Sequence, residues 1–380
     1  MNIGIVCYPT YGGSGVVATE LGIALARKGH KVHFVSYSQP FRLNQFNENL
    51  FYHEVSVNDY PLFEYQPYES VLASKIVDVA IYERLDVLHV HYAIPHASVA
   101  YMAQQILISK KIYLPYITTL HGTDITLVGK DPSFEPIIRF SLNKSNLITA
   151  VSEDLMKDTL RNFKIDNKIE VIPNFINISD YNKENQPCNK KHYAPNNQKL
   201  LVHVSNFRKV KRVDDVIAVF NKVRSKVDCK LILVGDGPER PQIEQLARKS
   251  EFHTDILSLG RIPNPIDILC LGDVFILPSE TESFGLAALE AMAMRMPVIS
   301  TNSGGLPEVN LNNYSGFTSN VGDVDAMAKH CYDLFTDEVL YSKMSEQAYL
   351  QALKFDESAI LSKYEDLYFK LHESGKKVSL

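Results

Sequence analysis

Short apolar runs alternate with longer amphipathic segments along the whole chain, and this pattern predicts a protein built on parallel sheets. Continuous apolar runs of strand length are typical of strands that are buried on both faces. In the first half they lie at residues 2–7, 31–36, 86–91, 116–120 and 147–151. Helical patterns separate most of them, and this order implies parallel strands joined by right-handed crossovers.

The alternation stops at a polar stretch with two prolines, residues 182–198, and then resumes. The second set of apolar runs lies at residues 199–205, 229–235, 255–260, 273–278 and 297–300. We therefore predict an α/β protein with two doubly wound, Rossmann-like domains, residues 1–168 and 169–356. The final helical segment, 357–380, is not assigned by its pattern, although it could complete the first domain. Ligands of such sheets bind beyond the carboxyl ends of the strands, so we expect a cleft between the two domains.

The bulk composition agrees with a globular enzyme of two domains. A chain of 380 residues exceeds what one hydrophobic core usually serves. The net charge of −5 argues against a nucleic-acid-binding protein. No signal peptide or membrane-spanning segment is visible, so we expect a cytoplasmic protein that does not insert into a membrane.

The cysteine pattern favours reduced thiols. The total is odd and no two cysteines have CxxC spacing. They are Cys7, Cys188, Cys229, Cys270 and Cys331.

A glycine-rich turn follows the first predicted strand, within YPTYGGSGVVATELG at residues 8–22. Gly13, Gly15 and Ala18 satisfy G-x-G-x-x-A, and free backbone N–H groups at a helix start attract anions. A dinucleotide site would also need an acidic residue at the end of the second predicted strand. Within residues 32–38, that end offers only Ser and Tyr. A small-anion site and a tight turn needed only for packing both remain open.

Three further loops follow strands of the second half. In SNFRKVKR (205–212), Arg208 and Lys211 supply the cations that a diphosphate requires, although a solvated basic loop is the alternative. The turn VGDGPE (234–239) is interpreted as structural. The stretch TESFGLAALE (281–290) carries two carboxylates, Glu282 and Glu290, and a glycine pair at 304–305 follows the next strand.

Histidines and paired aspartates raise the question of a metal. His89 and His91 share one face of a strand, but no third ligand has a recognisable spacing, so zinc is not expected there. Asp323 and Asp325 open an amphipathic segment, where helix capping explains them better than a magnesium site. From spacing alone, His121 is as well explained by a structural role as by a polar role in the cleft. We expect no essential metal.

These motifs, in this order, resemble the retaining glycosyltransferases of the GT-B type, glycogen-synthase-like family four. The resemblance covers nearly the whole chain. Within that family, the segments HVHYAIPHA (89–97), TTLHGTDIT (118–126) and ETESFGL (280–286) look like the bacterial members of bacillithiol biosynthesis. The resemblance implies transfer of N-acetylglucosamine from UDP-N-acetylglucosamine to the hydroxyl of L-malate, with no cofactor.

Residue by residue, the resemblance also implies site roles. Glu290 would hold the ribose, Glu282 a hydroxyl of the donor sugar, and Arg208 with Lys211 the diphosphate, while His121 would lie beside the reacting carbon. These last four are the expected catalytic residues. The other donor-binding positions are Gly13, Leu259, Gly260, Arg261, Ser283, Phe284, Gly285 and Leu286. The acceptor-binding positions are Ser14, Tyr92, Thr119 and Asn206.

Three rival functions stay open at this point. One is transfer of another sugar, or transfer to a lipid or polysaccharide acceptor. The second is a UDP-sugar epimerase of related fold, and the third is a UDP-sugar-binding sensor without turnover. Assembly into a homo-oligomer is also left open by the sequence.

Overall fold

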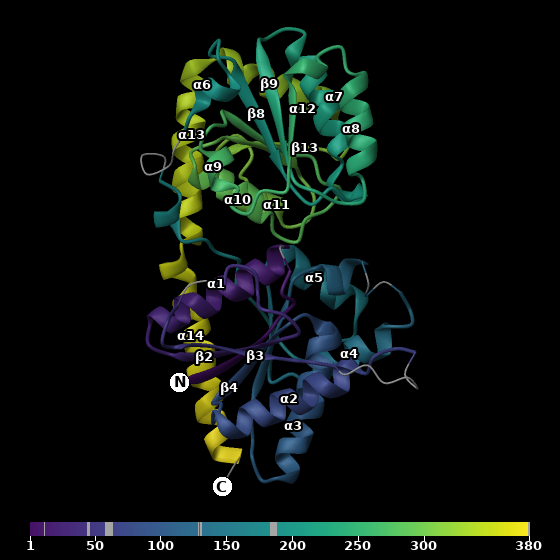
Figure 1. Cartoon of the computed structure of the whole chain (residues 1–380), viewed down its shortest axis with the longest axis vertical. Coiled ribbons are helices and arrows are strands. Elements are labelled where there is room, and N and C mark those ends of the chain that lie inside the picture. The colour runs from purple at the N-terminus through teal and green to yellow at the C-terminus, as the bar shows by residue number, and fades with distance from the viewer. Residues whose placement is uncertain are drawn as a thin grey trace. The chain divides into compact units, whose positions relative to one another are not determined.

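The chain folds into two compact units, each built on one sheet (Figure 1). The computed structural model describes residues 1–10, 12–43, 46–57, 64–127, 129, 131–182 and 188–378. Unit 1 comprises Met1–Asn174 and Glu357–Leu380, and unit 2 comprises Phe175–Asp356. Residues 183–187 of the predicted polar stretch lie outside the described residues.

Unit 1 contains a sheet of seven parallel strands in the order β3-β2-β1-β4-β5-β6-β7. The strands are β1 (Asn2–Val6), β2 (Lys31–Ser36), β3 (Leu50–Glu54), β4 (Val87–His91), β5 (Tyr116–Leu120), β6 (Leu147–Ala150) and β7 (Ile169–Val171). The helices are α1 (Gly13–Arg27), α2 (Tyr68–Tyr82), α3 (Ser98–Ser109), α4 (Glu135–Lys144), α5 (Glu153–Asn162) and α14 (Glu357–Val378).

Unit 2 contains a sheet of six parallel strands in the order β10-β9-β8-β11-β12-β13. The strands are β8 (Lys199–Val204), β9 (Cys229–Val234), β10 (Ile256–Gly260), β11 (Val274–Leu277), β12 (Val298–Thr301) and β13 (Gly316–Ser319). The helices are α6 (Lys190–Tyr193), α7 (Val213–Arg224), α8 (Arg240–Lys249), α9 (Ile266–Leu269), α10 (Leu286–Ala293), α11 (Leu306–Val309), α12 (Val324–Thr336) and α13 (Glu338–Ala352).

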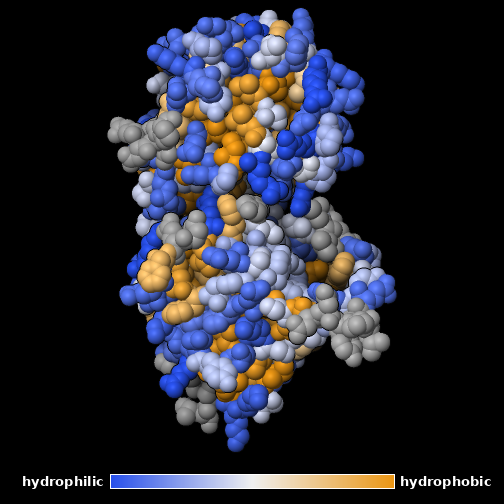
Figure 2. All heavy atoms as spheres, viewed as in Figure 1, coloured by the Kyte–Doolittle hydropathy of each residue, from blue (hydrophilic) through white to orange (hydrophobic). Residues whose placement is uncertain are grey.

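Both sheets reverse their strand order beside the first strand of the unit, which is the doubly wound arrangement that the sequence predicts. The central strands are buried on both faces, and β4, β5 and β11 have no exposed residue. This burial explains why their sequences are continuous apolar runs. In the space-filling view, apolar residues of unit 2 are visible over β8 and β9, with hydrophilic residues around them (Figure 2).

Helix ends follow the local sequence. The Ser152 hydroxyl accepts a hydrogen bond from the backbone N–H of Leu155 at the start of α5. The Asp323 carboxylate does the same for Ala326 at the start of α12, so the predicted capping role of this aspartate is confirmed. Each such cap contributes about 1 kcal/mol to the stability of its helix.

The C-terminal helix α14 belongs to unit 1, where it packs against α1 and β4. At its start, Glu357 pairs with Arg27 at 3.2 Å. Further along, the Tyr368 hydroxyl lies 2.6 Å from Nδ1 of the buried His89. An amphipathic pattern does not reveal which unit such a helix covers, because these contacts join residues that are hundreds of positions apart.

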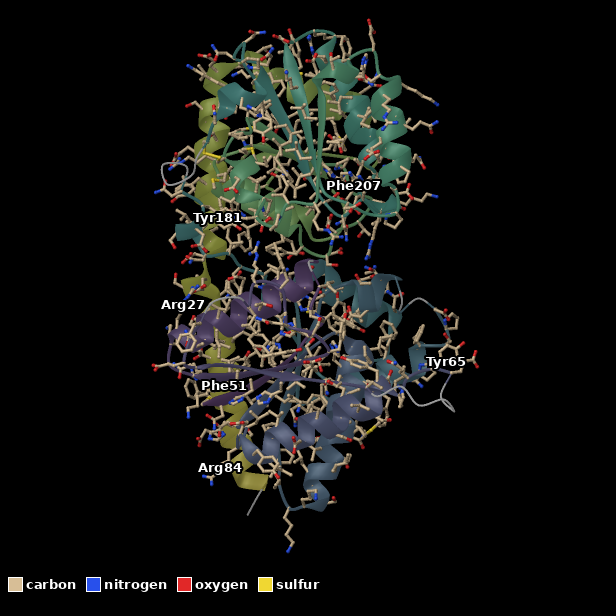
Figure 3. All side chains as sticks on the ribbon, in the orientation of Figure 1. Arg27, Phe51, Tyr65, Arg84, Tyr181 and Phe207 are labelled. Atoms are coloured by element: carbon tan, nitrogen blue, oxygen red, sulfur yellow. A yellow bond between two sulfur atoms is a disulfide. The ribbon has the colours of Figure 1, made fainter. Side chains whose placement is uncertain are left out.

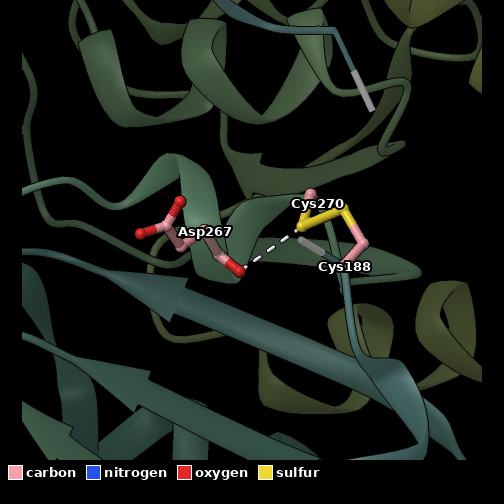
Figure 4. Close-up of a disulfide and its surroundings, with 3 residues drawn as sticks. All are labelled: Cys188, Asp267 and Cys270. Atoms are coloured by element: carbon pink, nitrogen blue, oxygen red, sulfur yellow. Dashed lines mark hydrogen bonds between the residues drawn. A yellow bond between two sulfur atoms is a disulfide. The ribbon is translucent and has the colours of Figure 1, made fainter. Parts of the chain in front are cut away.

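Two of the five cysteines form a disulfide, which corrects the prediction that all are reduced. Cys188 is bonded to Cys270, which directly follows α9, and their Cα atoms are 5.9 Å apart (Figure 4). The pair is separated by 82 residues in the sequence, so no local spacing signals it. The other three, Cys7, Cys229 and Cys331, are free and buried.

A thiol titration tests this pairing. Denatured protein should expose three thiols before reduction and five after it, because the disulfide withholds two of the five cysteines. The variant Cys188→Ser should show four thiols without any reductant. Five thiols in the unreduced wild-type protein would rule the disulfide out.

Candidate active site

Three predicted residues of unit 1 lie in the segments that follow adjacent strands. Ser14 lies in the first turn of α1 after β1, Tyr92 follows β4, and His121 follows β5. The Ser14 Oγ and Tyr92 hydroxyl oxygens are 2.7 Å apart, and the rings of Tyr92 and His121 are 5.5 Å apart. The structure therefore brings these three side chains together.

The start of α1 approaches the chain before it closely. A Cβ atom at Gly15 would lie 2.5 Å from the carbonyl oxygen of Thr10, so only glycine fits there. Gly13 is exposed at the first position of the helix, and nothing lies within 4 Å of the point that its Cβ would occupy. Tyr11 lies outside the described residues. The free end of a helix of 15 residues is thus accessible to an anion.

Tyr92 has a backbone conformation that is unusual for a tyrosine, with φ at 91°. Its backbone N–H donates to the carbonyl oxygen of Thr119 at 2.9 Å, which fixes this conformation. Left-handed conformations of bulky residues cost about 1–3 kcal/mol and gather at functional sites. The conformation places the Tyr92 hydroxyl on Ser14.

Thr119 is fully buried beneath these residues. Its Oγ1 lies 2.6 Å from Nε2 of His89 and 2.6 Å from Oγ1 of Thr149. The hydroxyl is therefore engaged inside unit 1, while the backbone carbonyl holds Tyr92. Thr119 therefore packs inside unit 1 and holds Tyr92, a predicted acceptor residue, in place.

His121 is backed by a network of buried histidines. Its Nε2 is 2.8 Å from Nδ1 of His91, and the His91 ring stacks on His89 with 4.4 Å between centroids. Burial lowers the pKa of His121 and of His89 to about 3 and holds the pKa of His91 well below its ordinary value. At neutral pH these rings are uncharged, so His121 can donate or accept a single hydrogen bond without carrying a charge.

Asp124 fixes the two loops that carry Tyr92 and His121. Its carboxylate accepts from the backbone N–H of Ala93 at 2.7 Å and of Gly122 at 3.0 Å. Burial raises the pKa of Asp124 to about 6, against the opposing effect of these hydrogen bonds. Neither pattern nor spacing singled out Asp124, although it lies in the quoted segment TTLHGTDIT.

The predicted residues of unit 2 gather after β8, β10 and β11. Arg208 is exposed in the loop after β8, and Lys211 in the same loop forms an ion pair with Glu282 after β11. Glu282 also accepts a hydrogen bond from the Ser279 hydroxyl at 2.8 Å. Within the described parts of the chain, Arg208 has no ionic partner. The loop thus presents one free guanidinium and one paired ammonium group.

The loop that carries Arg208 is held by the turn GDGPE. Phe207, labelled in Figure 3, donates its backbone N–H to the carbonyl oxygen of Asp236 at 2.9 Å and accepts from the N–H of Glu239 at 2.9 Å. Beneath the loop, His203 donates from Nδ1 to the carbonyl oxygen of Ile276 at 2.8 Å, so its Nε2 accepts from the Ser205 hydroxyl at 2.7 Å. The structural interpretation of the GDGPE turn fits these contacts.

The glycine pair after β12 fixes the backbone of Glu282. The Gly305 N–H donates to the carbonyl oxygen of Glu282 at 2.7 Å. Gly304 has φ at 64°, and a Cβ atom there would lie 2.2 Å from the same oxygen. Any side chain at this position would push the Glu282 loop away.

Glu290 lies in the helix that starts after Gly285. It is buried in α10, and its Oε1 accepts a hydrogen bond from the Tyr181 hydroxyl at 3.1 Å. Tyr181, labelled in Figure 3, comes from a segment 109 residues earlier in the chain. Sequence reasoning missed it because no local pattern reports so distant a contact.

The remaining predicted donor positions of unit 2 lie at the end of β10 and around the start of α10. Leu259 and Gly260 end β10, and Arg261 follows it with an exposed side chain. Ser283 and Leu286 are partly exposed, whereas Phe284 is buried and packs edge-on against Phe355 at 5.5 Å between ring centroids. Asn206, predicted on the acceptor side, is exposed on unit 2 in the loop after β8.

Comparison with known proteins identifies the family. A model of glycosyltransferase family 4 matches residues 11–180, and a model of group 1 glycosyl transferases matches residues 185–351. The N-acetyl-alpha-D-glucosaminyl L-malate synthase of Bacillus anthracis is 46% identical over 378 residues, which cover 99% of this chain and 98% of that protein. This chain is a group 1 glycosyltransferase.

Solved structures agree with this assignment. A glycosyltransferase from Rickettsia africae has a TM-score of 0.80 at 23% identity, covering 97% of this chain and 98% of the other. Anabaena HepE in complex with UDP and glucose has a TM-score of 0.81 at 17% identity, covering 97% and 99%. These likenesses confirm the predicted GT-B fold of the glycosyltransferase. No helix in the described parts of the chain is long and apolar enough to cross a membrane.

The buried histidines of this glycosyltransferase should make its stability depend on pH. Unfolded histidines titrate near pH 6.5, about three units above the pKa of His89 in the folded state. Below pH ~6.5 the unfolded state therefore binds more protons than the folded state. The free energy of unfolding is highest above that pH and falls as the pH decreases. Each such histidine contributes a slope of up to about 1.4 kcal/mol per pH unit.

Thermal unfolding midpoints between pH 7 and pH 4.5 check this expectation. The variant His89→Gln should lose less stability on acidification than the wild type. The difference should equal the contribution of one buried histidine to the pH dependence. The matched control His253→Gln changes an exposed histidine and should retain the wild-type slope. Identical slopes in all three proteins would contradict the argument.

Proposed function

We propose that the protein transfers N-acetylglucosamine from UDP-N-acetylglucosamine to the hydroxyl of L-malate, with retention of the α configuration. The observation that carries this proposal is the 46% identity over 99% of the chain with a synthase of that name. In the reaction the bond from the sugar C1 to the diphosphate oxygen breaks, and a bond from C1 to the malate hydroxyl oxygen forms on the same face, while the proton of that hydroxyl passes to the departing diphosphate.

The cations of unit 2 fit the diphosphate leaving group. Arg208 offers an exposed planar fork without an ionic partner among the described residues, and Lys211 offers a point charge. Negative charge grows on the diphosphate as the bond to C1 breaks, so fixed cations stabilise the transition state more than the bound substrate. The start of α10, with Ser283, Phe284, Gly285 and Leu286, adds backbone N–H groups.

The two glutamates fit hydroxyl groups rather than phosphate. Glu290 is buried and already accepts one hydrogen bond, from Tyr181, so its carboxylate is oriented to accept from ribose hydroxyls. Glu282 is held by Lys211 and Ser279, and we assign it to a hydroxyl of the donor sugar. Leu259, Gly260 and Arg261 are assigned to the uracil, and Gly13 to the donor.

The acceptor groups of unit 1 fit a small dicarboxylate. Ser14 and Tyr92 present hydroxyls beside the open start of α1, and these donors suit carboxylate oxygens. The neutral His121 is assigned to the reacting carbon, and Asn206 to an acceptor contact. We assign Thr119 to the same site through its hold on Tyr92.

We propose that transfer needs no metal ion. Arg208 and Lys211 supply the charge that a divalent cation would otherwise bring to a diphosphate. Turnover should therefore be insensitive to chelators.

Product analysis is the decisive test. Incubation with UDP-N-acetylglucosamine and L-malate, without added metal, should yield N-acetylglucosaminyl malate by mass spectrometry. Other UDP-sugars, and other hydroxy acids as acceptors, should react more slowly. Donor consumption without an acceptor would point to an epimerase instead, and UDP binding with no turnover of any acceptor would point to a sensor.

The division of roles between the glutamates is testable by binding and turnover. Glu290→Ala should weaken UDP binding about 10- to 100-fold, because a buried charged acceptor is lost. Glu282→Ala should leave UDP affinity unchanged or raise it, since Lys211 loses its partner, while turnover falls by at least about tenfold.

Calorimetric UDP titration and initial rates provide the two readouts. The exposed Glu280 supplies a matched control, because Glu280→Ala removes a carboxylate from the same loop and should change neither quantity. Equal losses of UDP affinity in Glu282→Ala and Glu290→Ala would overturn the assignment of separate roles.

A further inference from the structure

A cluster of two histidines and one glutamate lies at the β3 edge of the unit 1 sheet, apart from every residue assigned to transfer. His33 belongs to β2, His53 to β3, and Glu83 follows the last residue of α2. One nitrogen or carboxylate oxygen from each lies within 4.8 Å of the other two. Across the part of the chain that the structure describes, no other group of three such side chains meets this condition.

The strand register places the two imidazoles on one face of the sheet. Val35 in β2 is paired with His53 in β3, and His33 lies two residues before Val35. Because side chains in a strand alternate between faces, His33, Val35 and His53 all point to the same side. Packing of α2 on β2 brings Glu83 to that side as well. The three groups thus converge through ordinary sheet geometry.

The distance between the rings suits two ligands of one metal ion. Nδ1 of His33 is 3.0 Å from Nε2 of His53. A tetrahedral zinc ion with bonds of 2.0–2.1 Å to nitrogen holds its ligand atoms about 3.3 Å apart. The His33 ring is also held flat against Phe51, with 4.7 Å between ring centroids and 12° between planes. Phe51 in β3 and Arg84, the residue after Glu83, are labelled in Figure 3.

The polar atoms of the cluster are incompletely satisfied. Two neutral rings in contact share a single proton, and the outer nitrogen of His33, Nε2, is buried without a hydrogen-bond partner among the described residues. The Glu83 carboxylate likewise has no hydrogen-bond or ion-pair partner within the described chain. A metal ion bound by Nδ1 of His33 and Nε2 of His53 would also engage the Glu83 carboxylate, whereas Nε2 of His33 would keep its proton outside the coordination sphere.

The charge state of the cluster favours a cation. Each imidazole can offer the lone pair of one ring nitrogen to a metal ion. Glu83 and Asp78 add negative charge nearby, whereas Lys31 and Lys75 oppose it. His53 and Glu83 are partly exposed, which leaves a path for the ion to enter.

We propose that His33, His53 and Glu83 bind one divalent transition-metal ion, for which zinc is the best match. Two imidazoles and a carboxylate form a donor set that zinc accepts, and water can supply the fourth ligand from the exposed side. The ion would join β2, the edge strand β3 and the end of α2. This site is separate from the transfer chemistry, so the proposal does not rest on the proposed function.

Metal titration of the full chain tests the proposal. Protein stripped with a chelator and dialysed should bind one zinc ion per chain by calorimetry. Cobalt(II) at the same site should give the intense visible absorption of a four-coordinate ion. Zinc should also raise the thermal unfolding midpoint, by on the order of 5 °C at saturating concentration.

Variants locate the site. His53→Gln and Glu83→Gln should each weaken zinc binding by more than about tenfold and abolish the rise in the midpoint. The matched control is His30→Gln, since His30 lies 3.0 Å from Glu365 without a third metal ligand among the residues that the structure describes, and it should bind zinc as the wild type does. Circular dichroism confirms that each variant is folded. Absence of zinc binding, or equal affinity in His53→Gln and wild type, would overturn the proposal.

Discussion

Every strand pair described in both sheets is parallel, and this constraint places the loops that carry the candidate site. In a parallel sheet each connection leaves from the same edge, so loops that are distant in sequence become neighbours. Ser14, Tyr92 and His121 each follow a different strand of unit 1. In unit 2, Arg208 and Glu282 follow β8 and β11, which are adjacent. The sheets therefore fix the geometry, and the loops supply the chemistry.

The candidate site residues of the two units differ in their charge. In unit 1, burial keeps His89, His91 and His121 uncharged, so the site offers single hydrogen bonds from hydroxyls and a ring nitrogen. In unit 2, Lys211 and Glu282 meet in an ion pair. Neutral groups suit an acceptor that must stay nucleophilic, whereas charged groups suit a leaving group whose charge increases.

The sequence predicted the central strands well because burial on both faces makes them continuous apolar runs. It did not predict β3, β7 or β13. Each residue of β3 is partly or fully exposed, and β7 and β13 span only three and four residues. Such short or exposed edge strands are defined by their neighbours rather than by their own sequence. The sequence placed candidate residues such as Arg208 and Glu282 in loops after strands, and the structure has them there, but the contacts that hold these loops could not be predicted. Tyr181 reaches Glu290 across 109 residues, and the disulfide joins cysteines 82 residues apart.

Glu282 and Glu290 belong to one short sequence motif, but the structure gives them different surroundings. Glu282 lies on a loop, tied to Lys211 and Ser279 and held through its backbone by Gly305. Glu290 lies buried in α10 with Tyr181 as its partner. An acid and base acting on one bond would need a common reacting group and a mobile proton. Each glutamate instead has its own fixed partner, and the helix start at Gly285 lies between them in the chain. Two anionic acceptors on either side of a positive helix end match a ligand with hydroxyls at both ends and phosphates in the middle.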